Sequence, residues 1–98
     1  MKVFSEDGQC FIDMEYAFTI NEVDAFKNEL TPIIPIDKEF VVHCIDLKEI
    51  DSAGVQVLIA FKKHLEKEGK IFELTAGKKI KKFISFFMLE DYFQGSIV

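Results

Sequence analysis

The chain has 98 residues, which is enough for one domain but too short for two independent hydrophobic cores. Hydrophobic residues make up 49% and charged residues 30%, a composition typical of a folded globular domain and not of a disordered chain. The net charge is −5 and every basic residue is a lysine, so the sequence disfavours a nucleic-acid-binding protein and has no guanidinium group for two-point recognition of phosphate.

The charge is unevenly distributed along the chain. Residues 1–51 contain 4 lysines and 12 acidic residues, whereas residues 52–98 contain 8 lysines and 5 acidic residues. No apolar segment approaches the roughly 20 residues that span a bilayer, and the N-terminus has no apolar signal-peptide region. We therefore expect a cytoplasmic protein without membrane insertion.

The first residues predict a β-hairpin. Apolar and polar side chains alternate over residues 10–18, which is the period of a half-buried strand. One face of this strand holds Cys10, Ile12, Met14, Tyr16 and Phe18. Residues 2–5 can form its partner strand, because the Asp7-Gly8 pair between them favours a tight turn.

A helix is predicted after the hairpin. Asn21 is its expected N-cap, because asparagine side chains accept hydrogen bonds from the first amides of a helix. Apolar side chains then recur at helical spacing, at Val23, Phe26, Leu30 and Ile33. Pro32 and Pro35 end this helix, because proline lacks a backbone N–H.

The rest of the chain alternates strands with helices. Residues 40–47 form an apolar run typical of a central strand covered on both faces, and residues 71–75 form another strand. The intervening helix begins at about Ala53 and stops at Gly69. Its predicted inner stripe is Leu58, Phe61 and Leu65, and its outer face is Lys62, Lys63, Glu66 and Lys67. A third helix is marked by Ile80, Phe83, Ile84 and Phe87, with Lys78, Lys79, Lys81 and Lys82 off that stripe.

This order of elements predicts a single α/β domain over residues 1–98. Its sheet should be mixed and mostly parallel, opened by the hairpin, with about three to four helices packed on it. The lysines of the third helix form either a solvated face or a docking strip for an acidic protein or an anionic membrane surface.

The sequence contains no motif that indicates an enzyme. It has no nucleophile elbow, no glycine-rich phosphate loop and no zinc-protease motif. Cys10, Cys44, His43 and His64 lack the paired spacing of zinc ligands, so no metal is expected. The cysteines should be small buried hydrophobes, and His43 should lie in the core or on a sheet face. We expect neither catalysis nor a cofactor.

One serine allows two interpretations. Ser52 falls at or next to the N-cap of the second helix, where its hydroxyl could accept a hydrogen bond from a free amide. A serine at an exposed helix N-terminus is equally reachable by a kinase, and the helix dipole and free amides tolerate a phosphate there. The residues themselves leave open whether Ser52 is a cap or a phosphorylation switch.

Residues 41–63, VVHCIDLKEIDSAGVQVLIAFKK, resemble the signature of STAS domains, the anti-sigma factor antagonist family. The shared pattern is an apolar strand, then Asp-Leu, then Asp-Ser-Ala-Gly at the start of a helix. The order of the other elements fits as well, so the resemblance covers nearly the whole chain and implies a STAS fold. It further implies a bacterial, non-enzymatic protein-binding module of signal transduction.

The resemblance also implies partners and a binding surface. A serine kinase that acts as an anti-sigma-like partner would phosphorylate Ser52 and release the complex, and a phosphatase would restore it. The implied docking surface consists of Asp51, Ala53, Gly54, Gln56 and, in the loop after the second strand, Thr19 and Asn21.

The loop after the second strand departs from the family pattern. Residues 16–19, Tyr-Ala-Phe-Thr, stand where many antagonists carry Gly-Glu-hydrophobic-Asp, so two acidic groups are missing. An alternative is therefore an assembly or adaptor subunit of a chemotaxis or phospholipid-transport complex. In that alternative Ser52 is only a helix cap.

Overall fold

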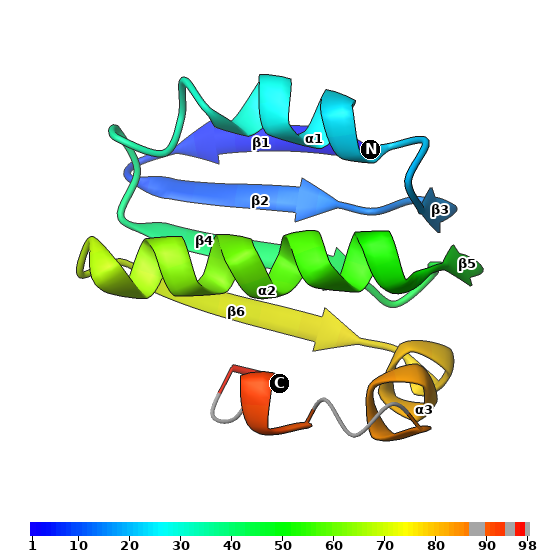
Figure 1. The fold of residues 1–98 in the computed structure, drawn as a ribbon. Helices are drawn as coiled ribbons and strands as arrows, with labels where there is room; N and C mark the ends of the chain where they lie inside the picture. Colours follow the sequence, from blue (N-terminus) through cyan, green and yellow to red (C-terminus); the bar gives the residue numbers. More distant parts are fainter. Residues whose placement is uncertain (87–89, 94–95, 98) are drawn as a thin grey trace.

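The computed structural model describes residues 1–86, 90–93 and 96–97. Its main sheet has the strand order β1-β2-β4-β6 (Figure 1). The four strands are β1 (Lys2–Glu6), β2 (Gln9–Asp13), β4 (Glu39–Cys44) and β6 (Ile71–Ala76). The β1–β2 hairpin is antiparallel, and β4 runs parallel to both of its neighbours. The prediction of a mixed, mostly parallel sheet opened by a hairpin is confirmed.

Two helices cover one face of this sheet, and the third lies beyond its edge (Figure 1). The covering helices are α1 (Val23–Leu30) and α2 (Ser52–Lys67). Beyond β6 lie α3 (Lys78–Phe86) and a short 3₁₀ helix, η1 (Glu90–Phe93). The α3 lysines are exposed, as expected, while Ile80 and Ile84 are buried; Phe87 lies outside the described residues. In the described part of the chain no helix is both long and apolar enough to cross a membrane.

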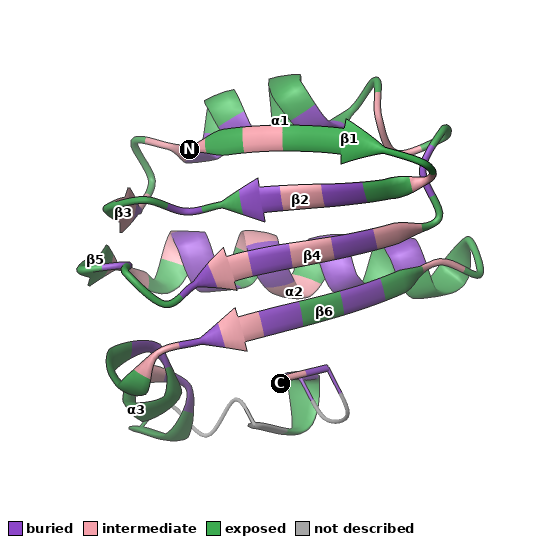
Figure 2. Ribbon diagram, turned by 180° about the vertical axis from the view of Figure 1, so that it is seen from behind, coloured by how far each residue is buried: buried purple, intermediate pink, exposed green. Residues whose placement is uncertain are grey.

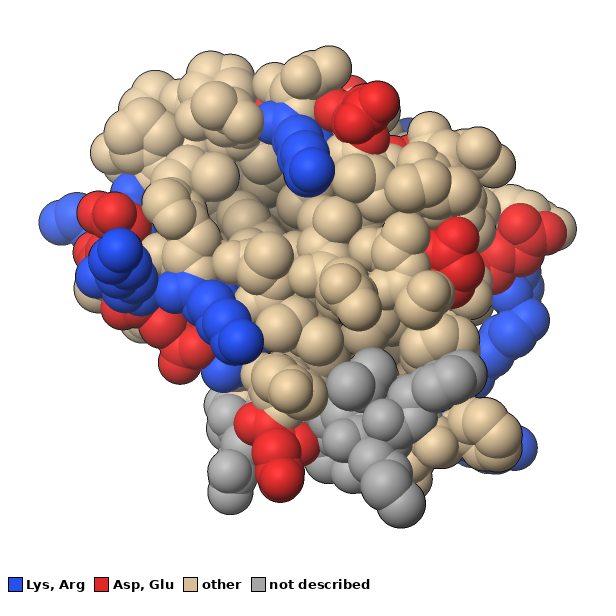
Figure 3. All heavy atoms as spheres, in the orientation of Figure 1, with Lys and Arg blue, Asp and Glu red and all other residues tan. Residues whose placement is uncertain are grey.

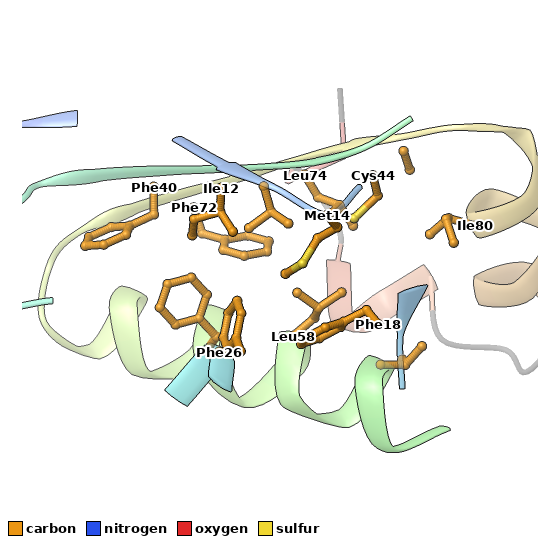
Figure 4. Close-up of a cluster of buried hydrophobic side chains, with 14 of the residues drawn as sticks. Ile12, Met14, Phe18, Phe26, Phe40, Cys44, Leu58, Phe72, Leu74 and Ile80 are labelled. Carbon is orange, nitrogen blue, oxygen red and sulfur yellow. The ribbon is translucent and has the colours of Figure 1, made fainter. Parts of the chain in front are cut away.

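A core of apolar side chains fills the space between the sheet and its two covering helices (Figure 4). An aromatic cluster forms one end of this core. The ring of Phe61 on α2 meets three other rings edge-on, with centroid distances of 5.3 Å to Phe26, 5.5 Å to Phe40 and 5.9 Å to Phe72. Edge-to-face geometry is an arrangement that aromatic quadrupoles favour. Because the rings come from α1, α2, β4 and β6, their contacts hold both helices on the sheet.

The strand predicted over residues 10–18 is shorter in the structure. The first long strand ends at Asp13, and the chain continues as β3 (Ala17–Phe18), which pairs with β5 (Glu49–Ile50) in a separate two-stranded sheet. Tyr16 is 61% exposed and does not share the buried face, so that part of the prediction is wrong. The alternation fails here because the carbonyl of Tyr16 accepts hydrogen bonds from the amides of Lys48, just before β5, and of Glu49, the first residue of β5.

The central strand also differs from its prediction. It ends at Cys44, and Ile45 beyond it is 59% exposed. Its predicted coverage on both faces is wrong, because both helices lie on one side and the outward residues of β4 are only half-buried. An apolar run indicates low polarity, but it does not show whether a second layer is present.

The start of α1 corrects the predicted cap. Glu22, not Asn21, occupies the N-cap position, and it makes no capping bond into the helix. Its carboxylate instead accepts hydrogen bonds of 2.8 Å from both the backbone amide and the hydroxyl of Thr19. The sequence signal for this arrangement is Thr-x-x-Glu, the capping-box pattern, at residues 19–22.

Two predictions about buried polar or sulfur groups have different outcomes. Cys10 and Cys44 are free and buried, as expected. Burial, and to a lesser extent the charge of Asp37, raises the pKa of the Cys10 thiol to about 11. Burial, and to a lesser extent the charge of Asp13, raises the pKa of the Cys44 thiol to about 12. Lys62 was expected on the outer face of α2 but is only 7% exposed. The expected exposure is therefore wrong. The ammonium group of Lys62 pairs with the exposed Glu66 at 2.8 Å, which compensates for the burial of its charge.

The aromatic cluster gives a first test. Replacing Phe61 by Leu removes three edge-on ring contacts and should lower the free energy of unfolding by about 1–3 kcal/mol. The matched change Phe4→Leu, at a ring that is 58% exposed, should cost less than about 0.5 kcal/mol. Urea unfolding followed by circular dichroism measures both. Equal losses for the two variants would show that the cluster does not hold the helices to the sheet.

Candidate functional site

The site is built around the first turn of α2, which begins directly after β5. Asp51 is the N-cap: its backbone is extended and its Oδ1 accepts a hydrogen bond of 2.9 Å from the amide of Gly54. Ser52 is therefore the first residue of the helix, and it is exposed. Ser52 therefore lies next to the N-cap, as expected. Of its two open interpretations the helix cap does not hold, because the carboxylate one residue earlier already occupies the capping position.

The Asp51 carboxylate also joins the helix to a second segment. Its Oδ2 accepts a hydrogen bond of 3.1 Å from the backbone amide of Ile20, in the loop between β3 and α1. The amides of Gly54 and Ile20, in that order of effect, lower the pKa of Asp51 because they stabilise its charged form. A negative charge at this end of a helix is also favoured by the helix dipole.

Gly54 is required by a close approach of two backbones. A Cβ at this position would lie 2.0 Å from the carbonyl oxygen of Phe18, far inside van der Waals contact. The first turn of α2 therefore rests directly on β3. The parallel pairing of Phe18 with Ile50 holds β3 beside the strand that leads into Asp51.

The residues of the predicted docking surface differ in their exposure. Gln56 is exposed and lies one turn along α2 from Ser52, on the same side of the helix. Ala53 and Thr19 are half-buried, and Thr19 is tied to Glu22. Asn21 is exposed, but the hydrogen bond from its loop to Asp51 comes from the backbone of Ile20.

Gly54 is buried, so it shapes the surface and offers little of itself to a partner. The structure thus brings Ser52, Asp51 and Gln56 to one surface, with the 19–22 loop beside them.

Two grooves flank the exposed ridge of α2. The first, with a volume of about 460 Å³, runs between α2 and the C-terminal elements. It is lined by Ser52, Val55, Gln56, Ile59, Ala60, Lys63, Phe83 and Tyr92. The second, of about 390 Å³, lies between α1 and α2, and Gln56 and Ala60 line it as well. The two grooves meet along the Gln56–Ala60 ridge.

This ridge is uncharged. Figure 3 shows a broad surface without charged groups over the middle of the helical face, with lysine and acidic side chains at its margins. No residue from Ser52 to Phe61 is charged. Of the residues that line the first groove, only Ser52 and Gln56 belong to the docking surface that the family resemblance implies. The uncharged sequence from Ser52 to Phe61 is the signal for the other α2 residues up to Ala60. Phe83 and Tyr92 are brought to the groove by the tertiary structure alone.

The described residues bring together no group of three or more histidine, cysteine or acidic side chains suited to a metal ion. Cys10 and Cys44 face the core, His64 is exposed on α2, and His43 lies on the opposite face of the sheet, stacked on Phe11. The expectation that His43 lies on a sheet face is confirmed. At the N-terminus of α2 the structure places the exposed hydroxyl of Ser52 beside the carboxylate of Asp51.

The fold is shared with solved proteins of known type. The anti-sigma factor antagonist SpoIIAA in its unphosphorylated form superposes with a TM-score of 0.81 at 14% identity, covering 99% of this chain and 84% of that one. The phosphorylated form of SpoIIAA, a Bacillus cell fate determinant, gives a TM-score of 0.76 at 14% identity, covering 99% and 87%.

A sulfate transporter family protein from Wolinella succinogenes is also similar, with a TM-score of 0.78 at 20% identity over 96% of this chain and 79% of that chain. No protein-family model matches the sequence, and no curated protein matches it. The fold is that of a STAS domain, as the sequence resemblance implied. At these identities the likeness shows the fold, and function has to be inferred from the site.

The capping carboxylate predicts a pH dependence. Because the pKa of Asp51 is lowered by folding, its charge contributes stability above the unfolded pKa of about 3.9, and this contribution is lost as the pH falls through the folded pKa. The stability advantage of the native chain over Asp51→Asn should therefore be present at about pH 7 and shrink below about pH 4. Urea midpoints of the two proteins across this range measure it, and a constant difference would contradict it.

The backbone contact at Gly54 predicts the sign of a substitution. Helix propensity alone would make Gly54→Ala stabilising by about 1 kcal/mol. The clash with the Phe18 carbonyl should instead make it destabilising by about 1–3 kcal/mol. Ala60→Gly, on the exposed part of the same helix, is the propensity control and should cost about 1 kcal/mol. A more stable Gly54→Ala protein would show that α2 does not rest on β3 in this way.

Proposed function

We propose that this protein is a non-enzymatic protein-binding module of the anti-sigma factor antagonist type, switched by phosphorylation of Ser52. One observation carries the proposal. Ser52 is an exposed hydroxyl at the head of an uncharged helix face, and the adjacent Asp51 already performs the capping for which a serine would otherwise be needed.

The position suits a modification that changes a surface without unfolding the protein. A phosphate adds a charge of about −1.5 to −2, next to Asp51 and at the end of the uncharged ridge. The helix N-terminus tolerates this charge, whereas a partner packed against Gln56 and the grooves would have to desolvate it. Phosphorylation should therefore release a partner while leaving the fold intact.

The partners that fit this scheme are a serine kinase that is itself the anti-sigma-like binding partner, and a phosphatase that removes the phosphate. The similarity to SpoIIAA, which has been solved in phosphorylated and unphosphorylated forms, supports this scheme. The docking surface would comprise Asp51, Ala53 and Gln56 with Thr19 and Asn21 at its border, around the buried Gly54.

A second candidate function is supported by the two grooves and the uncharged ridge between them. These features also suit a permanent contact in an assembly, such as a chemotaxis or transport complex, and a sulfate transporter family protein shares the fold. In that case α2 binds its partner regardless of phosphorylation. The role of Ser52 as a cap, which the sequence allowed for this alternative, is taken by Asp51.

The tolerance of the fold for charge at Ser52 can be measured without a partner. Ser52→Asp should keep the free energy of unfolding unchanged or raise it by about 0.3–1 kcal/mol, because the helix dipole favours a negative charge there. Ser52→Lys is the matched control and should lower it by a similar amount. A marked destabilisation by aspartate alone would contradict a switch that leaves the fold intact.

The switch itself is tested with a candidate serine kinase of the anti-sigma factor type. Incubation with the kinase and ATP should add one phosphate by mass spectrometry, and Ser52→Ala should abolish the addition. Ser85→Ala, which removes an exposed hydroxyl on α3, should leave it unchanged. In a pull-down, Ser52→Asp should weaken the kinase complex by about tenfold or more. If the Ser52→Ala variant is still fully phosphorylated, the proposed switch is wrong. If Ser52→Asp binds the kinase as tightly as the native chain does, the permanent assembly is favoured.

A further inference from the structure

The second surface of interest is the outer face of the main sheet, opposite α1 and α2. In the described part of the chain no helix crosses this face (Figure 2). Strand register arranges its twelve outward side chains in three rows across the sheet. The rows are Glu6, Gln9, Glu39 and Ile71; Phe4, Phe11, Val41 and Glu73; and Lys2, Asp13, His43 and Thr75.

The middle row forms an apolar centre. Phe4 on β1 is 58% exposed, and Phe11 on β2 and Val41 on β4 continue the row and are half-buried. The ring of Phe11 also stacks on that of His43, with 6.3 Å between centroids. Ile71, in the next row, is 50% exposed. A water-facing side of a sheet ordinarily carries polar side chains, so a connected apolar strip on it indicates a binding surface.

Acidic side chains surround this centre. The twelve outward side chains include a single lysine, Lys2, and four carboxylates, Glu6, Asp13, Glu39 and Glu73. This charge disfavours contact with an anionic membrane or a nucleic acid. It also disfavours back-to-back packing of two copies, because that packing would bring like charges together around the apolar centre.

We propose that the outer face binds a protein segment that presents an apolar side chain flanked by lysine or arginine. The apolar residue would pack on Phe4, Phe11 and Val41, and the basic groups would pair with the surrounding carboxylates. This surface lies on the opposite side of the sheet from Ser52, so it can be occupied together with the α2 face and does not depend on phosphorylation (Figures 1 and 2).

The test uses the full chain labelled with ¹⁵N and two short synthetic peptides. One peptide alternates lysine and leucine, and the other alternates glutamate and leucine. The basic peptide should shift the amide resonances of β2 and β4, and the acidic peptide should not. Shifts confined to α2 and the 19–22 loop, or equal shifts with both peptides, would overturn the proposal.

Charge variants separate a specific surface from general attraction to an acidic protein. Glu6→Lys with Glu73→Lys should weaken binding of the basic peptide by about fivefold or more. Glu29→Lys with Glu68→Lys makes the same charge change on exposed positions of α1 and the end of α2, and should change affinity by less than about twofold. Equal weakening in both double variants would show that only net charge matters.

Three further measurements complete the test. Phe4→Ser, at an exposed ring, should weaken peptide binding by about threefold or more while the thermal midpoint stays close to that of the native chain. Ser52→Asp should leave peptide binding unchanged, which separates this proposal from the fate of the phosphorylation switch. Self-association is measured by sedimentation of the native chain and of Phe4→Ser. If the native chain self-associates and Phe4→Ser does not, the outer face binds a second copy, and the proposal of a basic partner is wrong.

Discussion

The contact between the first turn of α2 and the backbone of Phe18 constrains the whole functional end of this domain. It is possible only because residue 54 has no side chain, and it brings the helix N-terminus against β3. The Asp51 carboxylate then joins the two segments, with one oxygen on Gly54 and the other on Ile20. Ser52 is exposed in the first turn of α2, next to the capping Asp51 and the half-buried Ala53.

This arrangement places the capping group and the proposed phosphorylation site on neighbouring residues. A serine that capped its own helix could not be modified without disturbing the hydrogen bond that it makes. Here the cap is a carboxylate whose pKa is lowered by hydrogen bonds from the amides of Gly54 and Ile20, so the capping bond does not use the hydroxyl of Ser52. The hydroxyl is therefore free of a capping role, and in the proposed switch a phosphate on it would add charge beside the uncharged ridge.

The two sides of the sheet have opposite character. The helical side presents an uncharged ridge between two grooves, whereas the open side presents an apolar strip ringed by carboxylates. The acidic half of the sequence supplies three of those carboxylates, Glu6, Asp13 and Glu39, because β1, β2 and β4 all precede residue 52. The uneven charge of the chain thus becomes an uneven charge of two faces, and one small domain can offer different chemistry to different partners.

The sequence by itself determined the class of fold, the order of the elements and the motif around Ser52, because periodicity, proline and glycine act locally and the Asp-Ser-Ala-Gly pattern is short. It did not determine which of two adjacent residues caps α2, because both types are good caps and the choice depends on where β5 ends. It could not show that residues 10–18 divide into two strands, since that division depends on the pairing of β3 with β5, which lie about 30 residues apart in the chain. It could not show that β4 is covered on one face only, or that Tyr92 reaches the groove beside Ser52. Those features were decided by the tertiary structure, because they depend on contacts between residues distant in sequence, for which local patterns carry no information.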